Sequence, residues 1–284
     1  MKNMNSIKRI VLSLFVVLSF SVQAAPTSTD SQNVIRESTP TQDIDLLTNK
    51  NVTKAIKNLE RIHTDVKLAV ALQALAMIPE NFYYSGKGGV DYWLRSAEDF
   101  ARTARALGKG LSVLTAKMEK GPVETALSTT ATQLTNVVSG ERGDVNYWMN
   151  RTQAIAEEIR SATDQIIRIS NKMGDQTTHV STAIISLSIV ITSSSSQGYG
   201  DQYYWARAAS IIAKLAHGCG NSLEYLAGAL PDPLYTVLST YSHQLVQVNG
   251  KGEGDASYWR DRTKAISKQT DNIGLALLEI SKQV

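Results

Sequence analysis

The chain has 284 residues, of which 43% are hydrophobic and 19% are charged. This composition excludes a charge-rich disordered chain and a collagen-like chain, and it supplies enough apolar side chains for one large domain or two smaller ones. The single cysteine excludes an intramolecular disulfide framework and a cysteine-based zinc finger.

Residues 1–24 have the pattern of a bacterial-type secretory signal peptide. Lys2, Lys8 and Arg9 precede an uninterrupted apolar stretch that ends in small residues. That stretch is shorter than the roughly 20 residues that a membrane-spanning helix needs. We therefore predict cleavage between Ala24 and Ala25, no integral membrane segment afterwards, and export to the periplasm or beyond the cell.

The charge balance changes once this segment is removed. Residues 1–24 hold three of the 29 basic residues and none of the 26 acidic ones, so the remainder has 26 of each and is formally neutral. Binding to nucleic acid rests on a basic excess that neutralises phosphates, so we expect no nucleic-acid partner. Residues 25–42 are rich in Ser, Thr, Pro and Gln, which predicts a flexible leader.

A repeated motif organises the rest of the chain. Every tryptophan directly follows a tyrosine, and the tryptophans recur along the chain at nearly equal intervals. In three of the four copies a Gly-Asp pair comes first, with the Asp four residues before the Trp. Regular recurrence of this kind indicates tandem supersecondary units. The four dipeptides are Tyr92-Trp93, Tyr147-Trp148, Tyr204-Trp205 and Tyr258-Trp259.

The spacing of apolar residues predicts the elements of each unit. Counted from each tryptophan, apolar or small residues recur at positions 0, +4, +7, +18, +21 and +25, which is a helical period. This predicts a long helix from about Asp91 to Met118, with counterparts in the other copies, and a shorter helix before each tryptophan.

The predicted fold class is therefore all-α. Residues 43–284 form tandem helical hairpins of about 55 residues, closed as a bundle or stacked as a short array. The segment from Ile44 to Ile62 is expected to be a degenerate capping helix. The predicted repeats cover about 70–118, 125–173, 182–230 and 236–284.

The Gly-Asp-x-x-Tyr-Trp motif has two interpretations. In the first, Asp144, Asp201 and Asp255 cap the long helices, and each tryptophan, which lies on the apolar stripe, packs in the core. In the second, the aromatic pairs form binding platforms at one end of the array. Register favours the core for the tryptophans, whereas the tyrosines lie one residue off the stripe. The candidate binding residues are Tyr92, Trp93, Tyr147, Trp148, Tyr204, Trp205, Tyr258 and Trp259.

No motif indicates catalysis, a metal or a cofactor. The four histidines are scattered, without the spacing that builds a three-ligand metal site. His217 and Cys219 are two residues apart and lie on different faces of a helix, which excludes a nucleophilic pair and predicts Cys219 as a small core residue.

Two classes of function remain. The preferred hypothesis is an exported, non-enzymatic helical-repeat protein that binds a protein partner, either in the periplasm or as a secreted factor of the effector type. The alternative is a carbohydrate- or small-ligand-binding protein that uses the Tyr-Trp motifs, or a hydrolase built around them. The two hypotheses differ in the role of the four Tyr-Trp pairs, which form the ligand site only in the alternative.

Overall fold

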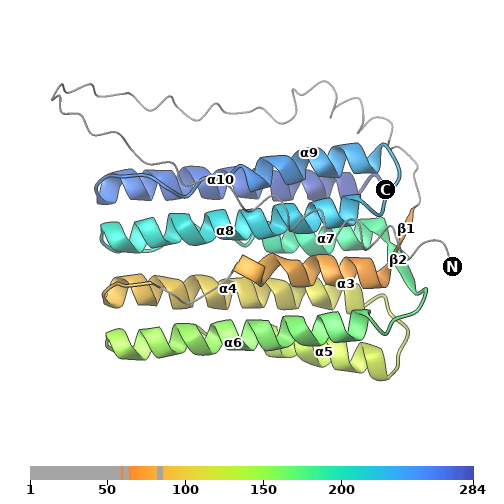
Figure 1. The fold of residues 1–284 in the computed structure, drawn as a ribbon, viewed down its shortest axis with the longest axis horizontal. Helices are drawn as coiled ribbons and strands as arrows, with labels where there is room; N and C mark the ends of the chain where they lie inside the picture. Colours follow the sequence, from red (N-terminus) through yellow and green to blue (C-terminus); the bar gives the residue numbers. More distant parts are fainter. Residues whose placement is uncertain (1–58, 60–63, 82–85) are drawn as a thin grey trace, which may run out of the picture. The chain divides into compact units, whose positions relative to one another are not determined.

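The protein is described by a computed structural model, which covers residue 59 and residues 64–81 and 86–284 (Figure 1). All of these belong to one compact unit that runs from Asp45 to Val284. The predicted signal peptide (1–24), the leader (25–42) and, apart from Leu59, the predicted capping helix lie outside the described residues. Helix accounts for 72% of the described residues, which confirms the all-α prediction in its main point.

Long and short helices alternate along the chain. The long helices are α4 (Val90–Thr115), α6 (Val145–Ser170), α8 (Gln202–Ala227) and α10 (Ala256–Ser281), each of 26 residues. The short helices are α3 (Leu68–Met77), α5 (Pro122–Thr135), α7 (Val180–Ile191) and α9 (Leu234–Val246). A 3-10 turn, η1 (Ile78–Asn81), follows α3. The helix predicted from Asp91 to Met118 thus begins one residue earlier and ends three residues earlier.

The structure also contains a small β-ribbon that the sequence did not predict. Strand β1 (Asp65–Lys67) pairs antiparallel with strand β2 (Thr177–His179). Each strand leads directly into a short helix, α3 or α7. Strands this short show too little alternation to be read from the sequence.

The four long helices are parallel and begin at the same end of the bundle (Figure 1). Hydrogen bonds join the first turns of α4 to α6 and of α8 to α10. Thr152 Oγ1 donates to the Trp93 carbonyl at 3.2 Å, and Thr263 Oγ1 donates to the Trp205 carbonyl at 3.1 Å. All four tryptophans therefore lie at this end, which we call the Trp end.

The two halves of the fold correspond element by element. The order strand, short helix, long helix, short helix, long helix runs from β1 to α6 and again from β2 to α10. In the ribbon, Val66 pairs with Thr178, its own equivalent, while Asp65 pairs with His179 and Lys67 with Thr177. This register is that of two equivalent strands meeting on a two-fold axis. The axis relates β1, α3, α4, α5 and α6 to β2, α7, α8, α9 and α10 in that order.

Helix packing does not follow chain order. Helices α5 and α9 pack on the long helices that precede them, α4 and α8. Helix α3 packs mainly on α6 and α8, and by the same symmetry α7 packs mainly on α10 and α4. The halves therefore interlock through their short helices.

Aliphatic side chains fill the space between the helices, and Cys219 is buried among them, as predicted. At Gly108 a side chain would lie 2.7 Å from the carbonyl oxygen of Ala131, so glycine permits the close approach of α5 to α4. None of the helices within the described part of the chain is long and apolar enough to cross a lipid bilayer.

Candidate functional site

The repeated motif forms the first turn of each long helix. Asp144, Asp201 and Asp255 are the N-caps of α6, α8 and α10. Their carboxylates accept hydrogen bonds from backbone N–H groups in the first turn, at 2.8 Å from Tyr147 and 2.9 Å from Tyr204 and Tyr258. In α4 the same position is held by Gly89, which provides no side-chain cap. The Asp of the motif thus performs the capping that its sequence position suggests.

Each tyrosine of the motif packs over a glycine turn. Its ring meets the neighbouring indole edge to face, with centroids 5.1–5.4 Å apart. In three copies the phenol end covers a glycine seven residues before the tryptophan. At these glycines, Gly86, Gly198 and Gly252, a side chain would collide with the tyrosine hydroxyl. Gly86 and Gly198 also have positive φ angles of 147° and 132°. In the sequence, this turn corresponds to a Gly-x-Gly pattern. The repeated motif includes only the second of these glycines, so the turn was not predicted from the sequence.

Three of the four indoles are buried. Trp93 and Trp148 are 4% exposed and Trp205 is 5% exposed, whereas Trp259 is half-buried. Flat stacking on a ligand needs an open ring face, so these three indoles are not available as platforms. Burial of the tryptophans is what their position on the apolar stripe favoured.

The tyrosines differ from copy to copy. Tyr147 and Tyr258 are partly exposed, Tyr92 is half-buried and Tyr204 is buried. The most open aromatic side chains at this end are two tyrosines that were not candidates: Tyr199, 97% exposed, and Tyr203, 60% exposed. Tyr203 occupies a variable position of the motif and Tyr199 precedes it, so neither is repeated in the other copies and repeat analysis could not identify them.

Tyr204 belongs to a buried polar network between the two halves. The Arg95 side chain, with no exposed surface, donates from Nη1 to the Tyr204 hydroxyl at 2.9 Å and to the Gln197 carbonyl at 2.8 Å. Its Nη2 donates to the Ser195 carbonyl at 2.8 Å. An arginine of α4 therefore holds the loop that leads into α8.

The negative partner of this arginine is Asp99. Arg95 Nε lies 2.8 Å from Asp99 Oδ2, and Arg102 Nη1 lies 2.7 Å from Asp99 Oδ1. Burial raises the pKa of the Asp99 carboxyl, and the two arginines oppose that shift. The Tyr204 hydroxyl in turn donates to Glu98 at 3.2 Å, and burial raises the pKa of Tyr204.

These buried charges serve the interface between the halves. They bond to one another and to backbone carbonyls rather than pointing into an open space. Burial also raises the pKa of the Cys219 thiol, and His217 Nε2 is 2.7 Å from the Val248 carbonyl. Within residues 64–81 and 86–284, no group of three or more His, Cys, Asp or Glu side chains is placed to hold a metal ion.

A cavity of about 640 Å³ opens at the Trp end. One wall is the loop from Ser196 to Gly200, which includes the exposed Tyr199, and Trp205 also contributes to the lining. The other wall is formed by Arg260 and Lys264 of α10. The cavity thus brings an exposed aromatic residue and two cationic residues to one place.

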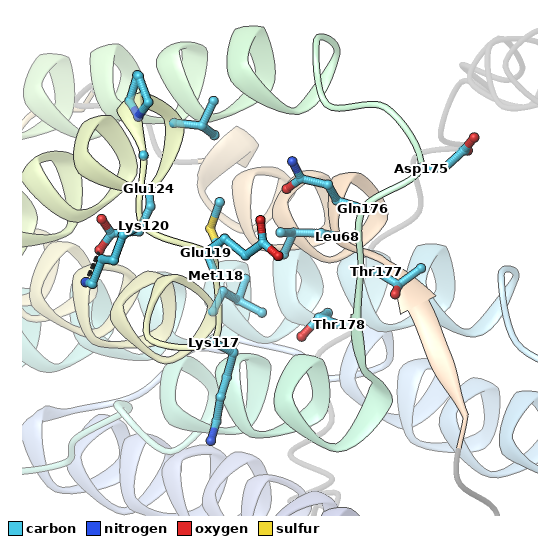
Figure 2. A pocket seen from close by; sticks show the side chains of 14 residues that line it. Leu68, Lys117, Met118, Glu119, Lys120, Glu124, Asp175, Gln176, Thr177 and Thr178 are labelled. Atoms are coloured by element: carbon cyan, nitrogen blue, oxygen red, sulfur yellow. Dashed lines mark hydrogen bonds and ion pairs between the residues drawn. The ribbon is translucent and has the colours of Figure 1, made fainter.

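A second cavity, of about 570 Å³, lies toward the opposite end (Figure 2). Leu68, Leu114 and Met118 contribute apolar surface, and the lining also includes Thr178 of β2. Charged side chains surround the opening, among them the ion pair of Lys120 with Glu124 at 2.9 Å. Its charges are of mixed sign, so it shows no clear preference for an anion or a cation.

No protein-family model, no curated protein and no solved structure matches this chain.

Proposed function

We propose that this protein is exported and acts by binding a protein partner at the Trp end. The observation that supports this most directly is the exposure of two large aromatic side chains at this end, Tyr199 in the cavity lining and Tyr203 in the first turn of α8. Aromatic residues and arginine are enriched at protein–protein interfaces. Covering an exposed aromatic side chain with a partner contributes favourably to the free energy of binding.

The proposal assigns the remaining features as follows. Residues 1–24 direct export and are removed, and residues 25–42 form a leader. The sequence repeat represents tandem helical hairpins that place four equivalent first turns at one end. The buried network of Arg95 and Asp99 keeps this end rigid, so that the tyrosines are presented without a large entropic cost on binding.

A carbohydrate or other small ligand is the second candidate. The observation in its favour is the cavity of about 640 Å³, whose volume lies in the range of small-molecule sites. The partner hypothesis is preferred because Tyr203 is an exposed aromatic residue that is not part of the cavity lining, which favours a contact area larger than a small ligand.

Export is tested by fractionation. The full chain and a variant that lacks residues 1–24 are expressed in a bacterium, and the protein is followed in cytoplasm, periplasm and medium. We expect the full chain outside the cytoplasm and shortened at Ala24, and the variant inside. An uncleaved full chain in the cytoplasm would contradict the proposal.

Partner binding is tested by site-specific photo-crosslinking. A photoreactive phenylalanine derivative replaces Tyr203 or, as the matched control, Tyr235, a partly exposed tyrosine in the first turn of α9 away from the Trp end. We expect one discrete protein adduct from position 203 and none from position 235. Equal adducts at both positions, or none at position 203 in envelope and culture fractions, would contradict partner binding at the Trp end.

A further inference from the structure

Two cations face the cavity at the Trp end from one side of α10. Arg260 and Lys264 are four residues apart and so lie on the same face of the helix. The eight residues that line this cavity include these two cations and no acidic side chain. The lining therefore carries a local positive charge in a chain whose predicted exported form is neutral overall.

The fold does not need these charges. The two-fold axis relates α10 to α6, and it places Met149 and Gln153 of α6 at the positions equivalent to Arg260 and Lys264. The equivalent helix of the first half is thus built with uncharged side chains at these two positions. Like charges at this spacing repel each other, so their presence lowers the stability of α10 slightly.

Neighbouring carboxylates do little to neutralise the pair. The acidic partner of Arg260 is the adjacent, exposed Asp261, with Nε and Oδ1 3.5 Å apart, and Arg260 Nη2 donates to Ser257 Oγ at 3.3 Å. Among the residues that the structure describes, no ion pair involves Lys264. Two cations beside a cavity therefore keep most of their capacity to bind an anion.

We infer that this cavity binds a carboxylate of an acidic peptide segment, placed between Arg260 and Lys264. The inference rests on the proposed function, because it assigns the chemistry of the protein partner. Asp201 and Asp255 already cap the N-termini of α8 and α10, so the positive charge at this cavity comes from the two side chains, Arg260 and Lys264.

A peptide fits this site better than an acidic sugar. Sugar rings are commonly held between aromatic faces, and in this lining the indole of Trp205 is only 5% exposed, which leaves Tyr199 as its one open ring. The open aromatic side chains, Tyr199 and Tyr203, belong to the loop and first turn beside the cavity. They offer contacts to residues that flank a bound carboxylate along an extended chain.

The test uses the full chain labelled with 5-fluorotryptophan and observed by fluorine NMR. The four tryptophans provide four resonances, and that of Trp205 is assigned by Trp205→Phe. A tetraglutamate peptide with blocked ends is the probe, and a blocked tetraglutamine peptide is its uncharged control. We expect tetraglutamate to shift the Trp205 resonance saturably, with weaker binding at higher salt, and tetraglutamine to leave it unchanged.

The double variant Arg260→Met, Lys264→Gln carries the residues of the equivalent positions in α6. We expect it to bind tetraglutamate at least about tenfold more weakly. Lys109→Gln, which removes an exposed charge from α4, is expected to bind like the unmodified chain. The three other tryptophan resonances report whether each variant is folded.

Three outcomes would overturn the inference. Tetraglutamine could shift the Trp205 resonance as strongly as tetraglutamate, or the double variant could bind tetraglutamate as well as the unmodified chain. A glucuronate-containing disaccharide could shift the resonance where the peptide does not, which would assign the cations to a glycan. Crosslinking at position 203 does not depend on these cations, so failure of the proposed function is distinguishable from failure of this inference.

Discussion

The guanidinium carbon of Arg95 lies 5.0 Å from the ring centroid of Tyr204, and that of Arg207 lies 4.8 Å from the ring centroid of Tyr92. Arg207 of α8 is the equivalent of Arg95 of α4, and Tyr204 is the equivalent of Tyr92. The two contacts are therefore one cation–π interaction made twice across the two-fold axis. Arg95 also donates to the Gln197 and Ser195 carbonyls of the other half, both at 2.8 Å, and Arg207 Nε donates to Ser96 Oγ at 2.8 Å.

Replacing Arg95 with methionine is expected to lower the free energy of unfolding by about 3–5 kcal/mol, because it leaves the buried Asp99 without its main partner. The measurement is urea denaturation followed by tryptophan fluorescence. Arg260→Met, at an exposed arginine, is the control and should change stability by less than about 0.5 kcal/mol. Adding Asp99→Asn to Arg95→Met should recover part of the loss. A loss below about 1 kcal/mol for Arg95→Met would contradict a central role for this pair.

Gly198→Ala is expected to destabilise the protein by about 2 kcal/mol or more, because the residue has a φ of 132° and a side chain there would collide with the Tyr204 hydroxyl. The displaced hydroxyl would also weaken its hydrogen bond with Arg95. Gly121→Ala is the control, because a side chain at that position meets nothing within 4 Å. Thermal unfolding of both variants makes the comparison, and equal midpoints would show that the glycine turn tolerates a side chain.

Thr178→Val is expected to stabilise the protein by about 1 kcal/mol, because it replaces an unpaired hydroxyl with a methyl group and removes a desolvation cost at nearly constant volume. Thr178 Oγ1 is buried without a hydrogen-bond partner among the described residues, and the equivalent position on the other strand is the buried Val66. The reverse change, Val66→Thr, should destabilise by about 1–3 kcal/mol. If Thr178→Val instead lowers stability in urea denaturation, the hydroxyl makes a favourable bond in solution.

Asp271→Asn is expected to stabilise the protein at neutral pH and to lose that effect in acid. Burial raises the pKa of Asp271, an effect opposed by hydrogen bonds from Ser194 at 3.0 Å and from Ser267. A carboxyl with a raised pKa binds a proton more readily in the folded state, so its contribution to stability falls as pH rises above about 4, the usual value for unfolded aspartate. Urea denaturation at pH 4 and at pH 7 measures the difference between the variant and the unmodified chain. A difference that grows toward acid would mean that the pKa of Asp271 is lowered instead.

The sequence identified the helices because their signals are local. The tryptophan register placed the first turns of all four long helices, and the Asp four residues before Trp148, Trp205 and Trp259 marked their N-caps. Core burial of Trp93 and Cys219 likewise follows from position along a helical stripe.

What the sequence did not provide depends on contacts between distant segments. The pairing of Asp65 with His179 joins residues far apart in the chain, and the role of Arg95 depends on Tyr204 in the other half. The repeat of four short units also hides a longer repeat of two halves. The buried charges lie between these halves, and α3 packs on α6 rather than mainly on its chain neighbour α4. Arg260 and Lys264 were not candidates in the sequence, because their position opposite the loop from Ser196 to Gly200 depends on the packing of α10.

The antiparallel register of β1 and β2 gives one chain the internal symmetry of a dimer. Two strands that are each other's equivalents, paired about Val66 and Thr178, form the contact that two identical subunits make in a symmetric dimer. Here a short connection after α6, which includes Asp175 and Gln176, joins the two copies into one polypeptide. The two halves differ at the equivalent positions of α6 and α10, where the first has Met149 and Gln153 and the second has Arg260 and Lys264. The two-fold arrangement alone would present the same helix face twice at the Trp end, so this difference in charge gives the two faces different chemistry.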